Sequence, residues 1–265
     1  MKKKIIIKSY KGFNFIGFFT LYKKEIMRFL NVATQTLLAP AITTMLFYII
    51  FAVALGKRVI EINSVDFAEF LAPGLVCMSI LQNAFANTSS SILISKVQGN
   101  IVDILMPPLS EIELTLAFAL GGITRGILVG LVVALTIYSF IPFDITNLIY
   151  LIYFSLSSAL LLSLLGIVCG IWSQKFDHMA GITNFIITPL TFLSGTFYSI
   201  DYLPEFWQIL ALLNPFFYII DGFRYSILGI NDSNVFLGGC IIAILNSLLI
   251  LICILIFKKG YKLKT

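Results

Sequence analysis

The side chains best suited to chemistry in this sequence are polar groups within long uncharged stretches. Arg125 is the clearest case, because a charged residue at the centre of a membrane-spanning helix costs roughly 2.5–3.5 kcal/mol to insert. Gln82, Asn83 and Asn87 lie together in another uncharged stretch. Such groups must face protein or water rather than lipid. They could line the path of an anionic or glycosylated substrate, or they could form structural contacts between helices.

Residue patterns for catalysis and nucleotide binding do not occur in the sequence. The phosphate-cradling pattern G-x-x-x-x-G-K-[ST] is absent, so any ATP and Mg²⁺ would have to be bound by a partner. His178 is the single histidine, and it has no second nitrogen or thiolate ligand nearby in sequence, so we expect no metal site. The carboxylates gather in loop segments, which argues against paired acids for catalysis within the membrane. We expect this chain to bind no cofactor.

The composition indicates that much of the chain lies in the apolar interior of a membrane rather than in water. Hydrophobic residues make up 59% of the 265 residues and charged residues 12%, and the mean hydropathy is +0.99. Six apolar runs reach the length of about 20 residues that crosses a bilayer. They cover residues 32–55, 69–96, 114–140, 148–172, 182–200 and 235–257. The sequence therefore predicts an all-α integral membrane protein with six transmembrane helices.

The distribution of Lys and Arg predicts the orientation. With the N-terminus inside, 14 of the 18 basic residues fall in inner segments, and Lys57, Arg58 and Arg224 fall in outer ones. This excess predicts that both termini are cytoplasmic. The basic ends flank apolar spans, so we expect membrane anchoring and no nucleic-acid partner. The predicted domains are a cytoplasmic N-terminus with an interfacial helix (1–30), a transmembrane domain (31–257) and a basic tail (258–265).

Three shorter segments complete the predicted architecture. Residues 13–30 mix aromatic residues with Lys23, Lys24 and Arg28, which is typical of an interfacial elbow helix in the headgroup layer. Residues 98–105 predict a short helix on the inner membrane surface, because Pro107-Pro108 ends it before the third span. It could dock a soluble partner or simply connect two spans. Residues 202–213 and 216–228 predict two re-entrant helices on the outer side.

Several motifs occur in a family-specific order. They are Phe70-Leu-Ala-Pro-Gly-Leu, Lys96-x-x-Gly-Asn-Ile-x-Asp-Ile-Leu-x-Pro-Pro, Pro189-Leu-Thr-Phe-Leu-Ser-Gly-Thr-Phe-Tyr198, Leu203-Pro, Leu213-Asn-Pro and Asp221-Gly-Phe-Arg224. Together they resemble the ABC-2 type permeases, in particular the small bacterial inner-membrane permeases related to drug, lipid and nodulation-factor exporters. The similarity extends over essentially the whole chain.

The resemblance implies a transport subunit rather than an enzyme. Members of the family pair with a second permease subunit, are surrounded by membrane lipids in the bacterial inner membrane, and are driven by a separate ATP-binding cassette ATPase. The implied cargo is amphipathic, lipid-like, glycosylated or drug-like. The inner helix after the second span acts as the coupling helix of the family. On this chain its ATPase contacts would be Gly99, Asn100, Asp103, Leu105 and Pro107.

Two other classes of function stay open from the residues alone. An ion-coupled secondary transporter often shows interrupted repeats and intramembrane acids, and neither is visible in this sequence. A membrane-embedded enzyme would need converging catalytic groups, which the loop positions of the acids do not favour. The chemical identity of the substrate does not follow from the sequence.

Overall fold

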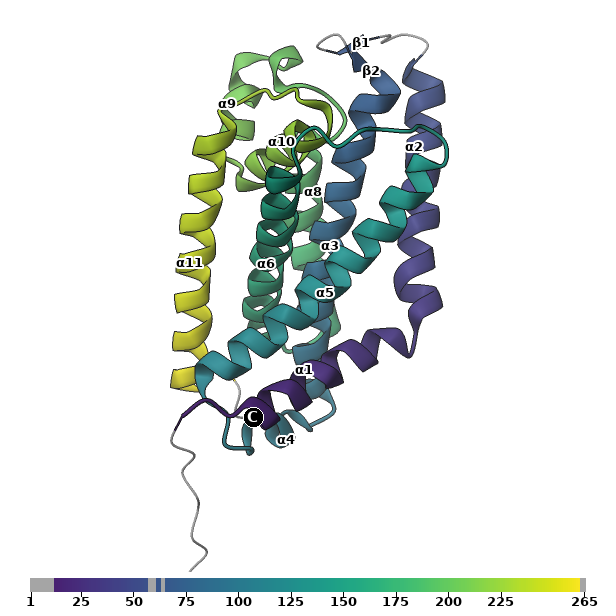
Figure 1. Cartoon of the computed structure of the whole chain (residues 1–265). Helices are drawn as coiled ribbons and strands as arrows, with labels where there is room; N and C mark the ends of the chain where they lie inside the picture. The colour runs from purple at the N-terminus through teal and green to yellow at the C-terminus, as the bar shows by residue number, and fades with distance from the viewer. Residues whose placement is uncertain (1–11, 57–60, 63–64, 263–265) are drawn as a thin grey trace, which may run out of the picture.

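The computed structural model describes residues 12–56, 61–62 and 65–262 (Figure 1). The lysines within residues 1–11, and Lys57, Arg58 and Lys264, lie outside these ranges. The described part of the chain is a bundle of helices, and its strands are the short antiparallel pair β1 (Glu61–Ile62) and β2 (Val65–Asp66). The predicted all-α class is therefore confirmed.

Five helices in the described ranges are long and apolar enough to cross a membrane. They are α2 (Ala39–Gly56) with the π-helical η1 (Thr34–Leu38) ahead of it, α3 (Phe67–Val97), α5 (Glu111–Tyr138), α6 (Leu148–Trp172) and α11 (Val235–Lys259). Four of them begin at a capping side chain that accepts a hydrogen bond from the first turn, namely Asp66, Ser110, Asn147 and Asn234. These helices confirm five of the predicted spans and a multi-pass membrane protein.

The bounds predicted for the span at 182–200 are wrong. The helical run consists of α7 (Phe176–Ile182), the π-helical η2 (Thr183–Ile187) and α8 (Thr188–Phe192), 17 residues in all. Gly195 ends the run with a left-handed φ of +73°, and Ser194 and Thr196 bond to the carbonyl of Thr191. An apolar sequence therefore continues beyond Phe192 although the helix does not.

A bent pair of helices follows the short η3 (Ile200–Tyr202). α9 (Glu205–Leu213) and α10 (Pro215–Leu228) meet at 87°, which fits either one broken span or a re-entrant loop. Asn214 caps α10 and donates to the carbonyl of Leu190 in α8. At its other end α10 accepts a hydrogen bond from Asn147 N–H, at the start of α6. Both ends of α10 are thus tied to the same end of the bundle.

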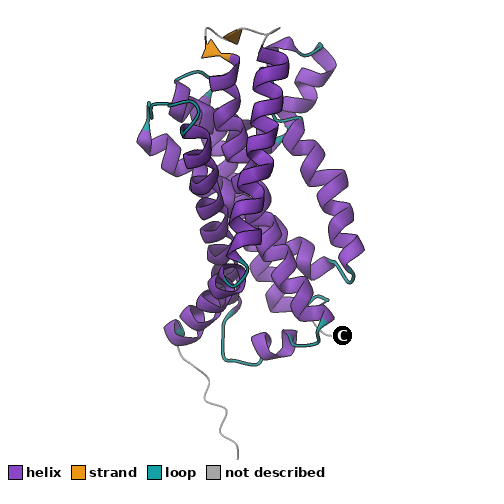
Figure 2. Cartoon of the chain, turned by 90° about the vertical axis from the view of Figure 1, so that its right-hand side faces the viewer, coloured by secondary structure: helices purple, strands orange, loops and turns teal. Residues whose placement is uncertain are grey.

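The two ends of the bundle differ in the elements that they carry. α1 (Phe15–Leu30), α4 (Ile101–Leu105) and the C-terminal end of α11 lie at one end, which we name the α4 end (Figure 1). The strands β1 and β2 lie at the opposite end, which we name the hairpin end, as Figure 2 also shows from the side.

The central element is α3. Its most apolar stretch is 83% buried inside the bundle, against 17% for the η1–α2 helix. Close packing depends on small residues of the neighbouring helices: a Cβ on Gly166 of α6 would lie 2.7 Å from the carbonyl oxygen of Phe85. Thr88 of α3 also donates to the carbonyl of Ser163, at 2.8 Å. The helix α2 therefore lies at the edge of the bundle and α3 at its centre.

The two π-helical segments stand at the same distance from a proline. η1 ends two residues before Pro40, and η2 ends two residues before Pro189. A proline lacks an N–H, and its ring crowds the carbonyl four residues earlier, so a wider turn relieves both problems. Each wider turn thus has a local cause in the sequence.

Candidate functional site

The helix α4 presents one buried face and one exposed face. Gly99 ends α3 with a left-handed φ of +76°, so α4 begins at Ile101, three residues later than predicted. Ile101 and Ile104 are buried and form its inner, apolar face. On the opposite face Val102 is 51% exposed and Met106 is 77% exposed. An apolar surface of this kind at one end of the bundle is suited to contact with a partner.

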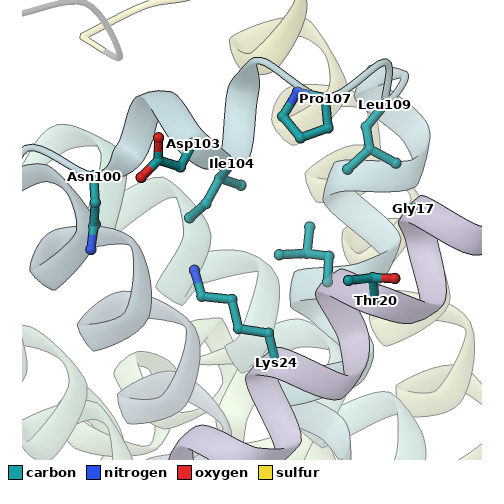
Figure 3. Close-up of a pocket in the computed structure, with 9 residues that line it drawn as sticks. Gly17, Thr20, Lys24, Asn100, Asp103, Ile104, Pro107 and Leu109 are labelled. Atoms are coloured by element: carbon teal, nitrogen blue, oxygen red, sulfur yellow. The ribbon is translucent and has the colours of Figure 1, made fainter.

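A pocket of about 430 Å³ separates α4 from α1 (Figure 3). Lys24 of α1 reaches across it toward α4. The pocket is lined by Gly17, Thr20, Leu21, Lys24, Asn100, Asp103, Ile104, Pro107 and Leu109. Of the predicted coupling residues, Gly99, Asn100, Asp103 and Pro107 are exposed, whereas Leu105 is half-buried against the core. Four of the five residues are therefore accessible at the α4 end.

The first turn of α1 is tied to the segment that joins α4 to α5. The side chain of Asn14 donates to the carbonyl of Pro108 at 3.2 Å, and its backbone N–H donates to Glu113. Glu113 also accepts from the N–H of Ser110 and so completes the capping box of α5. A displacement of α4 would therefore act on α1 and α5 together.

Further along α1, a charged pair enters the bundle. The side chain of Glu25 is fully buried, accepts a hydrogen bond from Ser91 at 2.7 Å, and lies 3.5 Å from the guanidinium of Arg28. Arg28 donates to the backbone and side-chain oxygens of Asn87, at 2.7 and 2.8 Å. Glu25 belongs to the helix predicted to be interfacial, yet it is buried against α5, where Gly121 leaves space for it. Asn87 is fully buried in this contact.

Two cavities meet on one face of α3 and share Gln82 and Asn83. The first, of about 510 Å³, is lined by Gln82, Asn83, Phe85, Ala86, Ser89, Ser90, Arg125, Met179, Thr183, Ile187 and Thr188. The second, of about 370 Å³, is lined by Gln35, Ala39, Pro40, Thr43, Thr44, Phe47, Leu75, Met78, Ser79, Gln82 and Asn83. We name both together the α3 groove. It follows residues 75–90 of α3, a length of roughly 22 Å.

Three of the four residues predicted for a substrate path line this groove. They are Gln82, Asn83 and Arg125, while Asn87 is not among the lining residues. The half-buried Arg125 donates to Asn83 Oδ1 at 3.2 Å. No carboxylate of the described residues lies within ion-pair distance of Arg125, and the charge that acts on it is the like charge of Arg28. Arg125 is thus a cation open to a cavity.

A chain of aromatic side chains extends from the groove lining toward the hairpin end. The ring centroids of Phe51 and Phe197 are 4.7 Å apart, and Phe197 stacks on Phe192 at 5.4 Å. Phe47, which lines the groove, lies 6.3 Å from Phe51. These four residues, which we name the aromatic cap, join α2 to the end of α8.

Arg224 of α10 has a different environment. It is 1% exposed, its guanidinium lies 3.8 Å from the ring centroid of Phe70, and it donates to the carbonyl of Gly195 at 2.5 Å. The carboxylates of Asp221 and Asp232 attract its charge. Arg224 therefore fixes α10 to α3 and to the turn after α8.

Comparison with known proteins identifies the family. A family model described as "ABC-2 type transporter" matches residues 16–228. The chain belongs to the ABC-2 transporter family. It is similar to the "Inner membrane transport permease YadH" of Escherichia coli (strain K12), with 36% identity over 246 residues that cover 93% of this chain and 96% of the relative. It is also similar to "Nodulation protein J" of Rhizobium leguminosarum bv. viciae, with 22% identity over 226 residues that cover 83% and 85% of the two chains.

The ABC-2 match covers the elements of both candidate sites. It runs from α1 to the end of α10, and so it includes α4, the α3 groove and Arg224. The resemblance drawn from the sequence motifs is confirmed. The sequence did not single out the Glu25–Arg28 pair, the exposed Val102 and Met106, or the aromatic cap. A signal was present for the first of these, because Glu25 and Arg28 stand three residues apart and share one helix face.

Proposed function

We propose that this chain is the permease subunit of an ATP-driven ABC-2 type exporter in the bacterial inner membrane. The carrying observation is the exposed α4, a short helix with an apolar outer face at the end of a bundle that has no phosphate-binding loop in its sequence. The similarity to YadH, whose name describes an inner membrane transport permease, supports the location and the transport role. The chain acts as a transport subunit and not as an enzyme.

In this proposal the α4 end is cytoplasmic, and both termini lie there. α1 is the elbow helix: its exposed Phe15, Ile16 and Phe19 would enter the lipid, and its exposed Lys23 and Lys24 would meet the headgroups and water. The helices α9 and α10 are re-entrant from the outer side, which is consistent with the tethering of both ends of α10 at the hairpin end. Six crossings then include the run 176–192, whose 17 residues reach the lower limit of a span.

A separate ATP-binding cassette ATPase docks on α4. Val102 and Met106 supply apolar contact, and Asp103 supplies a charge that a basic group on the ATPase can meet. ATP and Mg²⁺ bind to that partner. Because α1 is tied to the α4–α5 segment through Asn14, closure of two ATPase subunits would move α1 and α5 together with α4.

The substrate path is the α3 groove, and a second copy of this chain covers it. Gln35 and Thr43 are exposed on the η1–α2 helix, where lipid tails would leave their polar groups unsatisfied. The low burial of the same helix leaves a surface free for a second subunit. An amphipathic cargo would pass between the two subunits once the aromatic cap separates.

The test is co-purification with a candidate ATPase encoded beside this gene. Met106→Glu places a charge in the apolar face of α4, so we expect loss of the complex and of substrate-stimulated ATP hydrolysis. Gln174→Glu adds the same charge at an exposed position of the same end and should leave both intact. A full-strength complex with Met106→Glu would refute docking on α4.

A further inference from the structure

The charges around the α3 groove do not balance. On α1, α3 and α5 the described charges within the bundle near the groove are Glu25, Arg28 and Arg125. Glu25 lies 3.5 Å from Arg28, and Arg28 also donates to Asn87 and Ser90. This pair is therefore neutral and hydrogen-bonded. Arg125 remains as a positive charge without a counter-charge among the described residues.

The position of Arg125 shows that its guanidinium does not extend to the membrane surface. It is the fifteenth of the 28 residues of α5, and its guanidinium bonds to Asn83 near the middle of α3. A long side chain that snorkels would instead extend toward the nearer end of its helix. The guanidinium is therefore held at mid-depth, beside the cavity of about 510 Å³.

The cavity offers both kinds of surface that an amphiphile needs. Gln82, Ser89 and Ser90 add amide and hydroxyl groups to the lining that contains Arg125, and Phe85 and Ile187 add apolar side chains to the same lining. Guanidinium groups bind phosphate, sulfate and carboxylate through paired, charge-assisted hydrogen bonds. A single bound anion would neutralise Arg125 and offset the cost of its charge within the membrane.

We propose that Arg125 selects the anionic headgroup of an amphiphile that occupies the α3 groove. The headgroup binds at Arg125, whose guanidinium is positioned by its hydrogen bond to Asn83, and the alkyl chain lies along Phe85 and Ile187. This inference rests on the proposed transport function and narrows its substrate class, because neutral and cationic amphiphiles would leave Arg125 without compensation.

The experiment measures binding to the purified full-length chain in lipid nanodiscs of neutral net charge. The probes are dioctanoyl phosphatidic acid and dioctanoylglycerol, which share their acyl chains and differ by the phosphate. We expect the wild type to bind the phosphate form at least about tenfold more tightly, as charge-assisted pairing predicts. Dodecyl sulfate and dodecanoate, below the concentrations at which they unfold the chain, test whether other anions are accepted.

Substitutions then assign the effect to one side chain. Arg125→Gln should abolish the preference for the phosphate form, and Arg125→Lys should keep part of it because the charge is retained. Lys23→Gln removes an exposed positive charge outside the groove and should bind like the wild type. Thermal unfolding of each variant checks that it is folded. If Arg125→Gln does not fold, Arg125→Lys still tests the proposal, because it should keep only part of the preference for the phosphate form.

Three outcomes would overturn the proposal. They are equal binding of both probes by the wild type, an undiminished preference in Arg125→Gln, and an equal loss in Lys23→Gln, which would indicate attraction to the surface alone. The assay contains no ATPase. A failure of α4 docking therefore leaves this readout unchanged, and a failure here leaves the docking result unchanged.

Discussion

Arg125 and Arg224 are the same residue type in two regions of one bundle, and their surroundings differ. Each donates one of the hydrogen bonds described above, to Asn83 and to Gly195 respectively. Arg224 is 1% exposed, stacks on Phe70 and has two carboxylates nearby. Arg125 is half-buried beside a cavity and has the like charge of Arg28 nearby.

The difference separates a buried cation with counter-charges nearby from a cation beside a cavity. A buried charge with its counter-charges in place is costly to disturb, whereas a charge beside a cavity can exchange one partner for another. Hydrogen bonds alone do not distinguish the two arginines. The two arginines are distinguished by the charges near each guanidinium and by the cavity beside Arg125.

The largest expected effect follows from the loss of Arg224. Arg224→Met would leave Asp221 and Asp232 without the cation that attracts them, so we expect a loss of about 3–5 kcal/mol in unfolding free energy. The measurement is thermal unfolding of the purified chain, together with its yield as a single species in size-exclusion chromatography. Arg125→Met is the matched control and should retain at least the stability of the wild type. Equal destabilisation by both substitutions would show that the two arginines contribute to stability in the same way.

A second substitution makes Arg125 resemble Arg224. Asn83→Asp would place a carboxylate at the present hydrogen-bond acceptor, which lies 3.2 Å from the guanidinium. We expect about a tenfold loss in affinity for dioctanoyl phosphatidic acid, since the cation is already neutralised. Asn83→Ser removes the amide without adding charge and should keep most of the affinity. If Asn83→Asp bound the phosphate probe as tightly as wild type, Arg125 would not be the anion site.

A smaller effect is expected from a change in the aromatic cap, which joins α2 to the end of α8. Phe197→Ala removes the ring that contacts both Phe51 and Phe192 and should admit water into the groove from the hairpin end. A cysteine introduced at Ser79 in the groove, in a chain whose exposed Cys240 is replaced by Ser, reports this entry through its labelling by a membrane-impermeant maleimide. We expect several-fold faster labelling from the outside in Phe197→Ala than in Phe206→Ala, whose ring is 65% exposed on α9. Unchanged labelling would show that the cap is not the barrier.

The smallest effect concerns a cation that is compensated by carbonyl oxygens. Lys96 donates to the carbonyls of Ile171 and Ser173 at the C-terminal end of α6, at 2.5 and 2.6 Å. Lys96→Met should lower the unfolding free energy by about 0.3–1 kcal/mol, because those carbonyls at the C-terminal end of α6 lose a charged donor. Lys175→Met, at an exposed position nearby, should have little effect in the same denaturation assay. If Lys96→Met left the unfolding free energy unchanged, the argument that a compensated cation stabilises the fold would apply to the arginines alone.

The sequence predicted the long helices well because uncharged length is a direct consequence of the bilayer. It predicted the end of α4 for a similar reason, since Pro107-Pro108 cannot continue a helix. The end of α8 was missed because residues 193–200 remain uncharged, and hydropathy does not register the turn at Gly195. The burial of Glu25 was missed because a Glu–Arg pair three residues apart has the same sequence pattern on a wet surface as in a bundle.

The site was predictable only in part. Gln82, Asn83 and Arg125 were recognisable as polar residues in apolar runs, but their meeting depends on how α3 and α5 cross. The sequence pattern of α3 could not separate Asn83 from Asn87, because both are amides in the same helix. Their roles differ because Arg28 of α1 donates hydrogen bonds to Asn87 and none to Asn83.

The π-helical turns on either side of the groove bear on how a transporter of this kind could change its cargo. A π turn holds one residue more than an α turn, so losing one residue from Thr34–Leu38 would restore regular helix. Because the wider turn already absorbs the extra residue, the helix beyond it would keep its facing, whereas the same deletion in a regular α turn would rotate that helix by about 100°. A single-codon deletion at η1 or η2 would thus reshape the wall of the groove locally in one evolutionary step and leave the packing of the rest of that helix in place.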